Sequence, residues 1–246
     1  MIGFGALAAV TVVHFSEGAP LVGAIVAGTL AGIVPAAIFA LFTLRFSANI
    51  FVVGLAINLL SVGVLPFFSE QLFFTRGVVQ IDLGGASISY RSLVTIALAW
   101  AALTWIVLHR TVYGLRLRIA GEEEEWLRTR GISPAMVRVP AIFFSGASAG
   151  LAGSLLALRI GAYLPGLAAG RGWIALVVIF LGYRTVPGLA AAALLFGLLD
   201  AIAIRAQAIL DVPPTILLAL PYLLTVVAFV TWSAIRTYRN LPAQSK

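Results

Sequence analysis

The chain has 246 residues, of which 61% are hydrophobic and 10% charged, against roughly 45–50% and 25% in an ordinary soluble domain. A soluble fold cannot hide that much apolar surface, so the sequence predicts a protein of the lipid bilayer and excludes intrinsic disorder. The absence of cysteine excludes disulfide frameworks and thiolate catalysis. The net charge of +7 comes from arginines scattered between apolar runs, which indicates a topology signal rather than a nucleic-acid surface.

The apolar runs predict an all-α fold, a polytopic transmembrane helix bundle with about 6–8 membrane segments, since a span needs about 20 apolar residues. The longer apolar runs are 19–44, 50–68, 92–109, 139–158 and 214–235. Run 2–15 is too short to cross the bilayer comfortably, and runs 173–183 and 186–203 form a pair of shorter segments. Polar and helix-breaking residues at 183–188 split that pair, which is typical of a broken or re-entrant helix. No stretch between the runs is long enough for a second core, so we expect residues 1–246 to form a single membrane domain.

Arginine placement predicts which side each loop faces. Segment 110–138 holds six arginines, the tail holds Arg236, Arg239 and Lys246, and Arg45 follows the second run. The proposed spans place all three regions on one side, which the positive-inside rule assigns to the cytoplasm. We therefore expect a multi-pass protein of the cell membrane, surrounded by lipid, with 110–138 and the C-terminus cytoplasmic.

Small residues recur at helical spacing in two of the predicted spans. Gly28 and Gly32 form one GxxxG pattern, Gly146 and Gly150 form another, and Gly153 extends the second. Small side chains let helix backbones approach closely where lipid supplies no hydrophobic drive for association. The pattern favours a packed helix bundle.

Segment 110–138 has more detailed helix signals than a bare connector needs. Gly121 is expected to end one helix, and 122–125 is a run of four glutamates suited to the first turn of the next, where the helix dipole favours negative charge. Arg128 and Arg130 follow in its last turn, and Glu124 with Arg128 makes an i,i+4 pair.

A new helix is predicted to begin directly after this short one. Gly131 suits the position after a helix end, Ser133 suits an N-cap, and Pro134 suits the first helical turn. The residues alone leave two interpretations open: a solvated loop with a helical turn, or a docking helix for a cytoplasmic partner.

Segment 114–133, read continuously, is GLRLRIAGEEEEWLRTRGIS. It resembles the coupling-helix segment of ABC importer permeases of the branched-chain amino acid, ribose and nucleoside superfamily. The resemblance continues in order through four more segments, covering nearly the whole chain: 47–60, 145–154, 169–188 and 195–200. Segment 47–60 is similar to an Asn-containing span of the nucleoside and simple-sugar branch, which favours a nucleoside over ribose or a branched-chain amino acid.

The resemblance implies one half of a transporter, a membrane subunit that lacks an ATPase domain of its own. Such permeases pair with a second permease subunit, identical or related, with a cytoplasmic ATP-binding-cassette ATPase, and with an extracytoplasmic solute-binding lipoprotein. A Walker A motif needs a lysine, and the only lysine is Lys246. We therefore expect no catalytic residue, no metal and no cofactor in this chain, with ATP used by the partner. By position, ATPase coupling falls to Gly121, Glu122, Glu123, Glu124, Glu125, Arg128, Arg130 and Gly131.

Polar residues inside spans are candidates for the substrate path, because burying them in lipid is costly. Asn58 and Ser61 lie three residues apart on one face of the third run, and Asn49 lies near its start. We assign Arg184, in the broken pair, and Ser145, which opens the segment 145–154, to the same path. For each the alternative is a structural hydrogen bond, between helices or to freed carbonyls.

Two other functions remain open at this stage. An ATP-independent secondary transporter usually needs buried acidic residues for ion coupling, and only Asp200 lies close to a span interior. A truncated, non-transporting scaffold subunit is the other. Permeases of this type generally carry further spans before a pattern Asn-Ile-Gly-x-Glu-Gly, which segment 2–6 resembles without its glutamate. An intramembrane enzyme is disfavoured, since His14 and His109 lie far apart and no catalytic arrangement is present.

Overall fold

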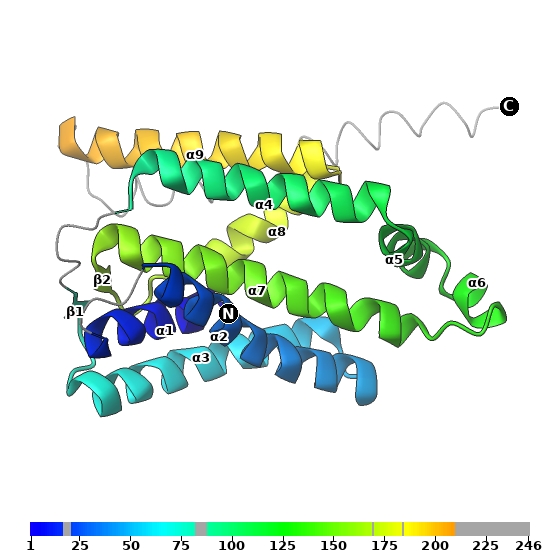
Figure 1. Cartoon of the computed structure of the whole chain (residues 1–246), viewed down its shortest axis with the longest axis horizontal. Helices are drawn as coiled ribbons and strands as arrows, with labels where there is room; N and C mark the ends of the chain where they lie inside the picture. The colour runs from blue at the N-terminus through cyan, green and yellow to red at the C-terminus, as the bar shows by residue number, and fades with distance from the viewer. Residues whose placement is uncertain (17–20, 82–87, 169, 184, 210–246) are drawn as a thin grey trace, which may run out of the picture. The chain divides into compact units, whose positions relative to one another are not determined.

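The computed structural model describes residues 1–16, 21–81, 88–168, 170–183 and 185–209. The chain divides into two compact units, Met1–Ala168 and Ala169–Lys246. Each unit is a set of helices, so the expected all-α class is confirmed (Figure 1). The predicted span 214–235, the tail arginines and Arg184 lie outside the described residues.

The first unit contains most of the described helices. In chain order its elements are α1 (Ile2–Phe15), α2 (Leu21–Ala40), the π-helix η1 (Leu41–Arg45), α3 (Ile50–Phe73), β1 (Val79–Gln80), α4 (Tyr90–Arg110), α5 (Val112–Glu122), α6 (Glu124–Thr129), α7 (Pro134–Ile160) and β2 (Ala162–Tyr163).

Four helices in the described part of the chain are long and apolar enough to cross a membrane: Leu21–Arg45, Ile50–Phe73, Tyr90–Arg110 and Pro134–Ile160. Shorter apolar helices occupy Ile2–Phe15, Arg171–Leu181 and Val186–Ile202. Helices satisfy every backbone group internally, which hydrocarbon demands. The predicted polytopic bundle is therefore confirmed, with α1 at its predicted bounds and α3 extended beyond its apolar run to Phe73.

Helix α7 packs on α1 and α2 with its backbone in direct contact with theirs at a row of glycines. A Cβ on Gly150 would lie 3.0 Å from Cα of Gly32 and would collide with the carbonyl oxygen of Gly28. A Cβ on Gly153 would likewise strike the carbonyl of Ile2 on α1. The two GxxxG patterns predicted from the sequence thus meet each other, and glycine is required at their contact.

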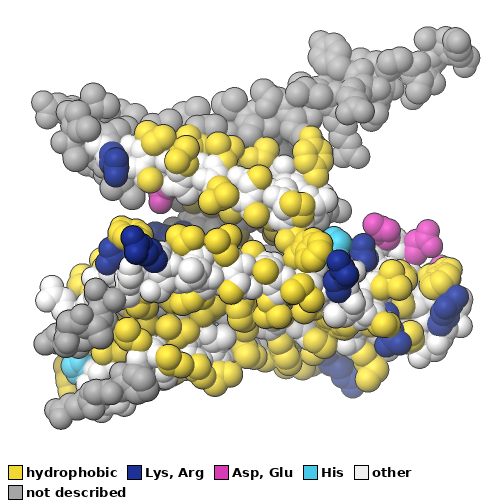
Figure 2. Space-filling model, turned by 45° about the horizontal axis from the view of Figure 1, so that its top comes forward, with side chains coloured by type: hydrophobic (Ala, Val, Ile, Leu, Met, Phe, Trp, Pro, Cys, Tyr) yellow, Lys and Arg dark blue, Asp and Glu magenta, His cyan; other side chains and the backbone are white. Residues whose placement is uncertain are grey.

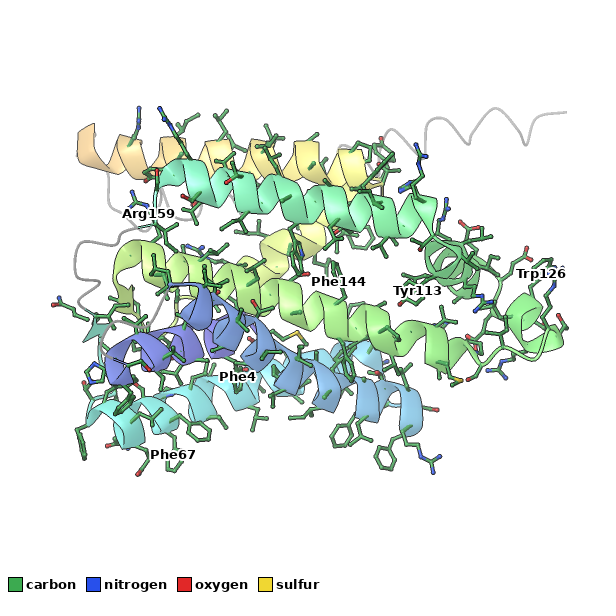
Figure 3. The ribbon with its side chains drawn as sticks, in the orientation of Figure 1. Phe4, Phe67, Tyr113, Trp126, Phe144 and Arg159 are labelled. Carbon is green, nitrogen blue, oxygen red and sulfur yellow. The ribbon has the colours of Figure 1, made fainter. Side chains whose placement is uncertain are left out.

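Helices α3 and α4 are joined to the unit through side chains instead. No residue of α4 is buried. On α4, Trp100 donates its indole N–H to Oγ of Ser148 on α7 at 2.9 Å and stacks on Phe144 with the ring centroids 5.2 Å apart. Phe67 of α3 points away from the bundle (Figure 3) and is 55% exposed. These faces suit contact with lipid or with another subunit.

The two ends of the first unit differ. At one end β1 and β2 form a two-stranded antiparallel sheet in which Val79 pairs with Tyr163. At the other end lie α5 and α6 (Figure 1). Figure 2 shows hydrophobic side chains along the helices and acidic side chains gathered at the end that carries α6.

The second unit contains α8 (Arg171–Leu181) and α9 (Val186–Ile209), packed around Val178, Ala192 and Phe196. The predicted break between them is present, since α8 ends at Leu181 and α9 begins at Val186. A Cβ on Gly182 would lie 2.5 Å from the backbone nitrogen of Leu189, so the turn needs glycine there. Tyr183 in this turn has a left-handed φ of 52°.

Candidate functional site

The end of the first unit that carries α5 and α6 begins with a sharp break between α4 and α5. Thr111 is extended, with φ −116° and ψ 153°, and its Oγ1 accepts a hydrogen bond from the backbone N–H of Gly114 at 3.1 Å. A Cβ on Gly114 would collide with the carbonyl oxygens of Val107 and Leu108. Thr111 therefore caps α5, and Gly114 lets it leave α4 at a tight angle.

The short predicted helix is present as α6, but its start differs from the expectation. Helix α5 continues through Gly121 to Glu122, and Glu123 is non-helical, with φ −138° and ψ 81°. Only Glu124 and Glu125 stand in the first turn of α6. The expectation that Gly121 ends the preceding helix is off by one residue, and the four glutamates do not share one turn. The buried side chain of Leu127, 2% exposed, fixes how α6 is rotated.

The turn from α6 to α7 is as predicted. Gly131 has φ 73°, a left-handed conformation that glycine adopts without strain. Its N–H donates to the carbonyl of Arg128, and Ile132 donates to Leu127, both at 3.0 Å. Pro134 opens α7, and Ser133 stands at the N-cap position without a side-chain cap. The chain is thereby sent back into the bundle within a few residues.

These three helices share a small core of their own. Ala120 of α5, Leu127 of α6 and Val137 of α7 are buried together. Partly buried side chains pack around them: Tyr113, Leu117, Ile119 and Ile132. The segment 112–138 is therefore a folded element with a small core of its own.

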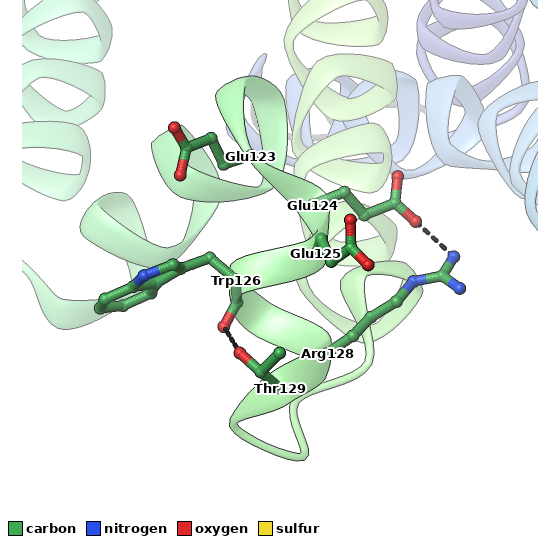
Figure 4. Close-up of a pocket in the computed structure, with 6 residues that line it drawn as sticks. All are labelled: Glu123, Glu124, Glu125, Trp126, Arg128 and Thr129. Atoms are coloured by element: carbon green, nitrogen blue, oxygen red, sulfur yellow. Dashed lines mark hydrogen bonds and ion pairs between the residues drawn. The ribbon is translucent and has the colours of Figure 1, made fainter.

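Ion pairs centred on Glu124 hold this element together. Its carboxylate accepts from Arg128 of α6 at 2.6 Å and from Arg138 of α7 at 2.9 Å (Figure 4 shows the first). The same nitrogen of Arg138 also donates to the carbonyl of Ala120 at 2.7 Å. The hydrogen bonds from Arg128 and Arg138 keep the pKa of the Glu124 carboxyl below its ordinary value of 4.5.

A second link joins α5 to α7. The Tyr113 hydroxyl donates to the carbonyl of Val137 at 2.9 Å, and Figure 3 shows the ring between the two helices. Burial raises the pKa of this hydroxyl above its ordinary value of 10.0, so Tyr113 stays protonated at neutral pH.

The outer face of α6 is free to meet a partner. Trp126 is 46% exposed, and the guanidinium of Arg130 lies over its ring at 4.0 Å. An open hollow of about 780 Å³ beside it is lined by Glu123, Glu124, Glu125, Trp126, Arg128 and Thr129 (Figure 4). An exposed tryptophan stacked by arginine, flanked by carboxylates, is typical of the residues that anchor protein interfaces.

Among the described residues, the side chains predicted for a substrate path lie on two helices, α3 and α7. Oδ1 of Asn49 accepts from the backbone N–H of Phe51 at 2.9 Å and so caps α3. Ser61 donates to the carbonyl of Ile57 within its own helix at 2.6 Å. Asn58 on α3 and Ser145 on α7 have exposed side chains. Their place in a path stays a prediction.

Sequence reasoning missed Tyr113, Trp126 and Arg138 as members of the site. Arg138 entered only as a topology charge, because its partners Ala120 and Glu124 lie beyond the reach of any i,i+4 pattern. Trp126 had one available signal, an aromatic residue on a short, highly charged helix. Tyr113 had none, since its hydroxyl bonds a backbone carbonyl.

Residues 1–229 match the family described as Branched-chain amino acid transport system / permease component. TsgC13 of Haloferax volcanii, whose name describes a glucose ABC transporter permease, is 29% identical over 85% of this chain and 74% of its own length. The guanosine ABC transporter permease NupQ of Bacillus subtilis is 30% identical over 85% and 70%. The nucleoside ABC transporter permease NupC of Lactococcus lactis is 28% identical over 81% and 69%. No solved structure matches.

Proposed function

This chain belongs to the family of permease components of the branched-chain amino acid transport system, and we propose that it carries a nucleoside or simple sugar across the cell membrane as the membrane-spanning subunit of an ABC importer. The single observation that carries the proposal is the family match over residues 1–229. The chain is a transporter permease rather than an enzyme, and ATP is hydrolysed by a separate subunit.

The substrate class rests on the names of the relatives. Two of them are named for guanosine or nucleosides and one for glucose, and all these solutes present several hydroxyl groups. Hydroxyl and amide side chains suit such solutes because they donate and accept hydrogen bonds. The path residues in this proposal are Asn49, Asn58, Ser61, Ser145 and Arg184. Asn58 supports it best, because its amide is exposed within the apolar helix α3.

The ATPase docks on the α6 element in this proposal. The residues of the contact are Gly121, Glu122, Glu123, Glu124, Glu125, Arg128, Arg130 and Gly131. Support comes from the compact α5–α6–α7 core, which gives the partner a shape to recognise, and from the exposed stack of Trp126 and Arg130. Segment 110–138 and the C-terminus then face the cytoplasm, in agreement with the six arginines of that segment.

The complete importer holds three further components: the ATPase, a second permease subunit that is identical or related, and an extracytoplasmic solute-binding lipoprotein. The exposed apolar faces of α3 and α4 offer surface for the second permease and for lipid. The β1–β2 end lies opposite α5 and α6 (Figure 1), as the delivery side of an importer must.

A mild-detergent affinity purification of the tagged chain from its native membrane tests the proposal. We expect mass spectrometry to identify a Walker-type ATPase, a second permease and a solute-binding lipoprotein. Recovery of the chain alone, in good yield and correctly folded, would overturn it.

Charge reversal then tests the docking site itself. Arg128→Glu with Arg130→Glu, or deletion of 122–130, should abolish recovery of the ATPase while leaving membrane insertion intact. The matched control is Arg116→Glu with Arg118→Glu, the same change of charge on the exposed side of α5. Undiminished ATPase recovery in the deletion would contradict the assignment of α6.

A further inference from the structure

Arg138 fastens α6 to the transmembrane helix α7. It stands in the first turns of α7, and one nitrogen of its guanidinium reaches the carbonyl of Ala120 at 2.7 Å and the carboxylate of Glu124 at 2.9 Å. The carbonyl belongs to the end of α5 and the carboxylate to the start of α6. One side chain therefore ties the ends of two short helices to a third.

This part of α7 needs such support. Pro140 lies inside the helix and has no N–H to donate, so one carbonyl of the preceding turn loses its intrahelical partner. Tyr113 adds its hydrogen bond to the neighbouring carbonyl of Val137 from the α5 side. Leu127 and Val137 fill the space between the two polar links. The start of α7 is thus attached to α5 and α6 by polar links and by a shared core.

Beyond that point α7 continues into its glycine contacts. Gly146 and Gly150 meet Gly32 of α2, and Gly153 meets the start of α1. Where backbones touch directly, as they do at these glycines, a displacement of one helix is passed to the next with little loss. By contrast α4 meets α7 through the side chains of Trp100, Phe144 and Ser148.

We propose that Arg138 is the positioning residue that locks α6 to α7, so that a displacement of α6 moves α7 together with α1 and α2 as one body. The inference rests on the proposed function, because the ATPase supplies the displacement. Arg128 pairs with the same carboxylate but stands on α6 itself, so it cannot link the two helices.

The functional test uses the complete complex in proteoliposomes, with uptake of labelled guanosine or glucose measured per ATP hydrolysed. Arg138→Gln should retain the ATPase and its basal hydrolysis and lower uptake per ATP by about tenfold, within the usual range of coupling between sites. Arg138→Lys, which keeps the positive charge, should retain most of the uptake per ATP. The control Arg118→Gln removes an equal charge from the exposed side of α5 and should match the unmodified complex.

A structural test needs no partner. Because the chain has no cysteine, spin labels can be attached selectively to two introduced cysteines, Thr129→Cys on α6 and Ile160→Cys at the far end of α7. Both positions are exposed. The distribution of distances between the two labels, measured by pulsed electron paramagnetic resonance, should be narrow in the parent chain and clearly broader with Arg138→Gln. Tyr113→Phe should broaden the distribution less.

The outcomes separate the inference from the function on which it rests. Failure to recover any ATPase with the parent chain defeats the proposed function, and the distance measurement still decides whether Arg138 holds α6. Unchanged uptake per ATP, or an unchanged distance distribution, in Arg138→Gln overturns the inference. Loss of the ATPase in that variant overturns it as well, since Arg138 would then act in docking.

Discussion

Helix α7 has two kinds of neighbour. Against α1 and α2 it presents glycines, and its backbone touches theirs directly. Against α4 it presents side chains: Phe144 and Ser148 meet Trp100, and the guanidinium of Arg159 lies over the ring of Tyr90 at 4.2 Å. In lipid, where apolar surface alone drives little association, close backbone packing is the stronger means of holding helices.

The difference indicates which helices move together. The block of α1, α2 and α7 combines direct backbone contacts at its glycines with a shared core of buried side chains, so it is expected to respond as a unit. Helix α4 is held through side chains, by a hydrogen bond, a stacked ring, a cation–π contact and the packing of Leu93 and Ile96. Such contacts tolerate sliding more readily than touching backbones do. A permease that changes shape needs both kinds of contact, one to carry a displacement and one to allow it.

The largest effect is expected where the backbones touch. Gly150→Leu places a side chain against the carbonyl of Gly28 and the backbone of Gly32, which cannot move aside. We expect the substitution to lower the free energy of unfolding by about 3 kcal/mol or more, which is at or above the upper end of the range for overpacked side chains. Thermal unfolding of the detergent-purified chain should show a much lower midpoint.

Gly63→Leu is the matched control, because no atom lies within 4 Å of a Cβ placed there. It should leave the midpoint unchanged or raise it slightly, since leucine favours a helix over glycine. Equal destabilisation by both substitutions would contradict the packing described for α7.

A smaller effect is expected at α4. Trp100→Phe removes the indole donor to Ser148 and keeps an aromatic ring against Phe144. The free energy of unfolding should fall by about 1 kcal/mol or less, as it does for other hydrogen bonds between membrane helices. The unfolding midpoint reports it, and Ser148→Ala should cost a similar amount.

The double variant Trp100→Phe with Ser148→Ala should cost no more than either single change, because both remove the same bond. Trp105→Phe, five residues further along α4, is the control. Additive losses in the double variant would show that the hydrogen bond is not what holds α4.

The smallest effect at neutral pH concerns Glu124. Its folded-state pKa is lowered by Arg128 and Arg138, so its ion pairs contribute fully above the ordinary pKa and are lost as the pH falls through the lowered one. The mobility of a spin label at Thr129→Cys should stay constant from neutral pH down to about 4.5, the ordinary value, and rise below it.

Glu124→Gln should make that label mobile at every pH, whereas Glu125→Gln should leave the parent profile intact. A label that loosens already at neutral pH in the parent chain would contradict the ion-pair geometry at α6.

Local patterns predicted much of this molecule. Gly131 and Pro134 identified the turn into α7 because glycine and proline carry their backbone preferences with them. The GxxxG patterns at Gly28 and Gly146 predicted close packing because a small side chain has the same consequence in any span. Helix class and approximate bounds followed from hydropathy alone.

Contacts between distant residues were beyond such patterns. Asn49 was predicted for the path, which stays a prediction, and its role as the cap of α3 was not foreseen because an amide can serve either role. Glu123 was placed in the helix that begins one residue later, because burial of Leu127 sets the helix start. Arg138 required the return of α7 beside α5 and α6 before its partners could be known.

The most direct test of ATP-driven import through this permease is uptake of labelled guanosine and glucose by proteoliposomes that contain the complete complex, with and without enclosed ATP at the ATPase face. We expect uptake of one of these solutes only with ATP, and loss of that uptake when Arg128 and Arg130 are changed to glutamate. Uptake that continues without ATP and follows an imposed ion gradient would contradict it.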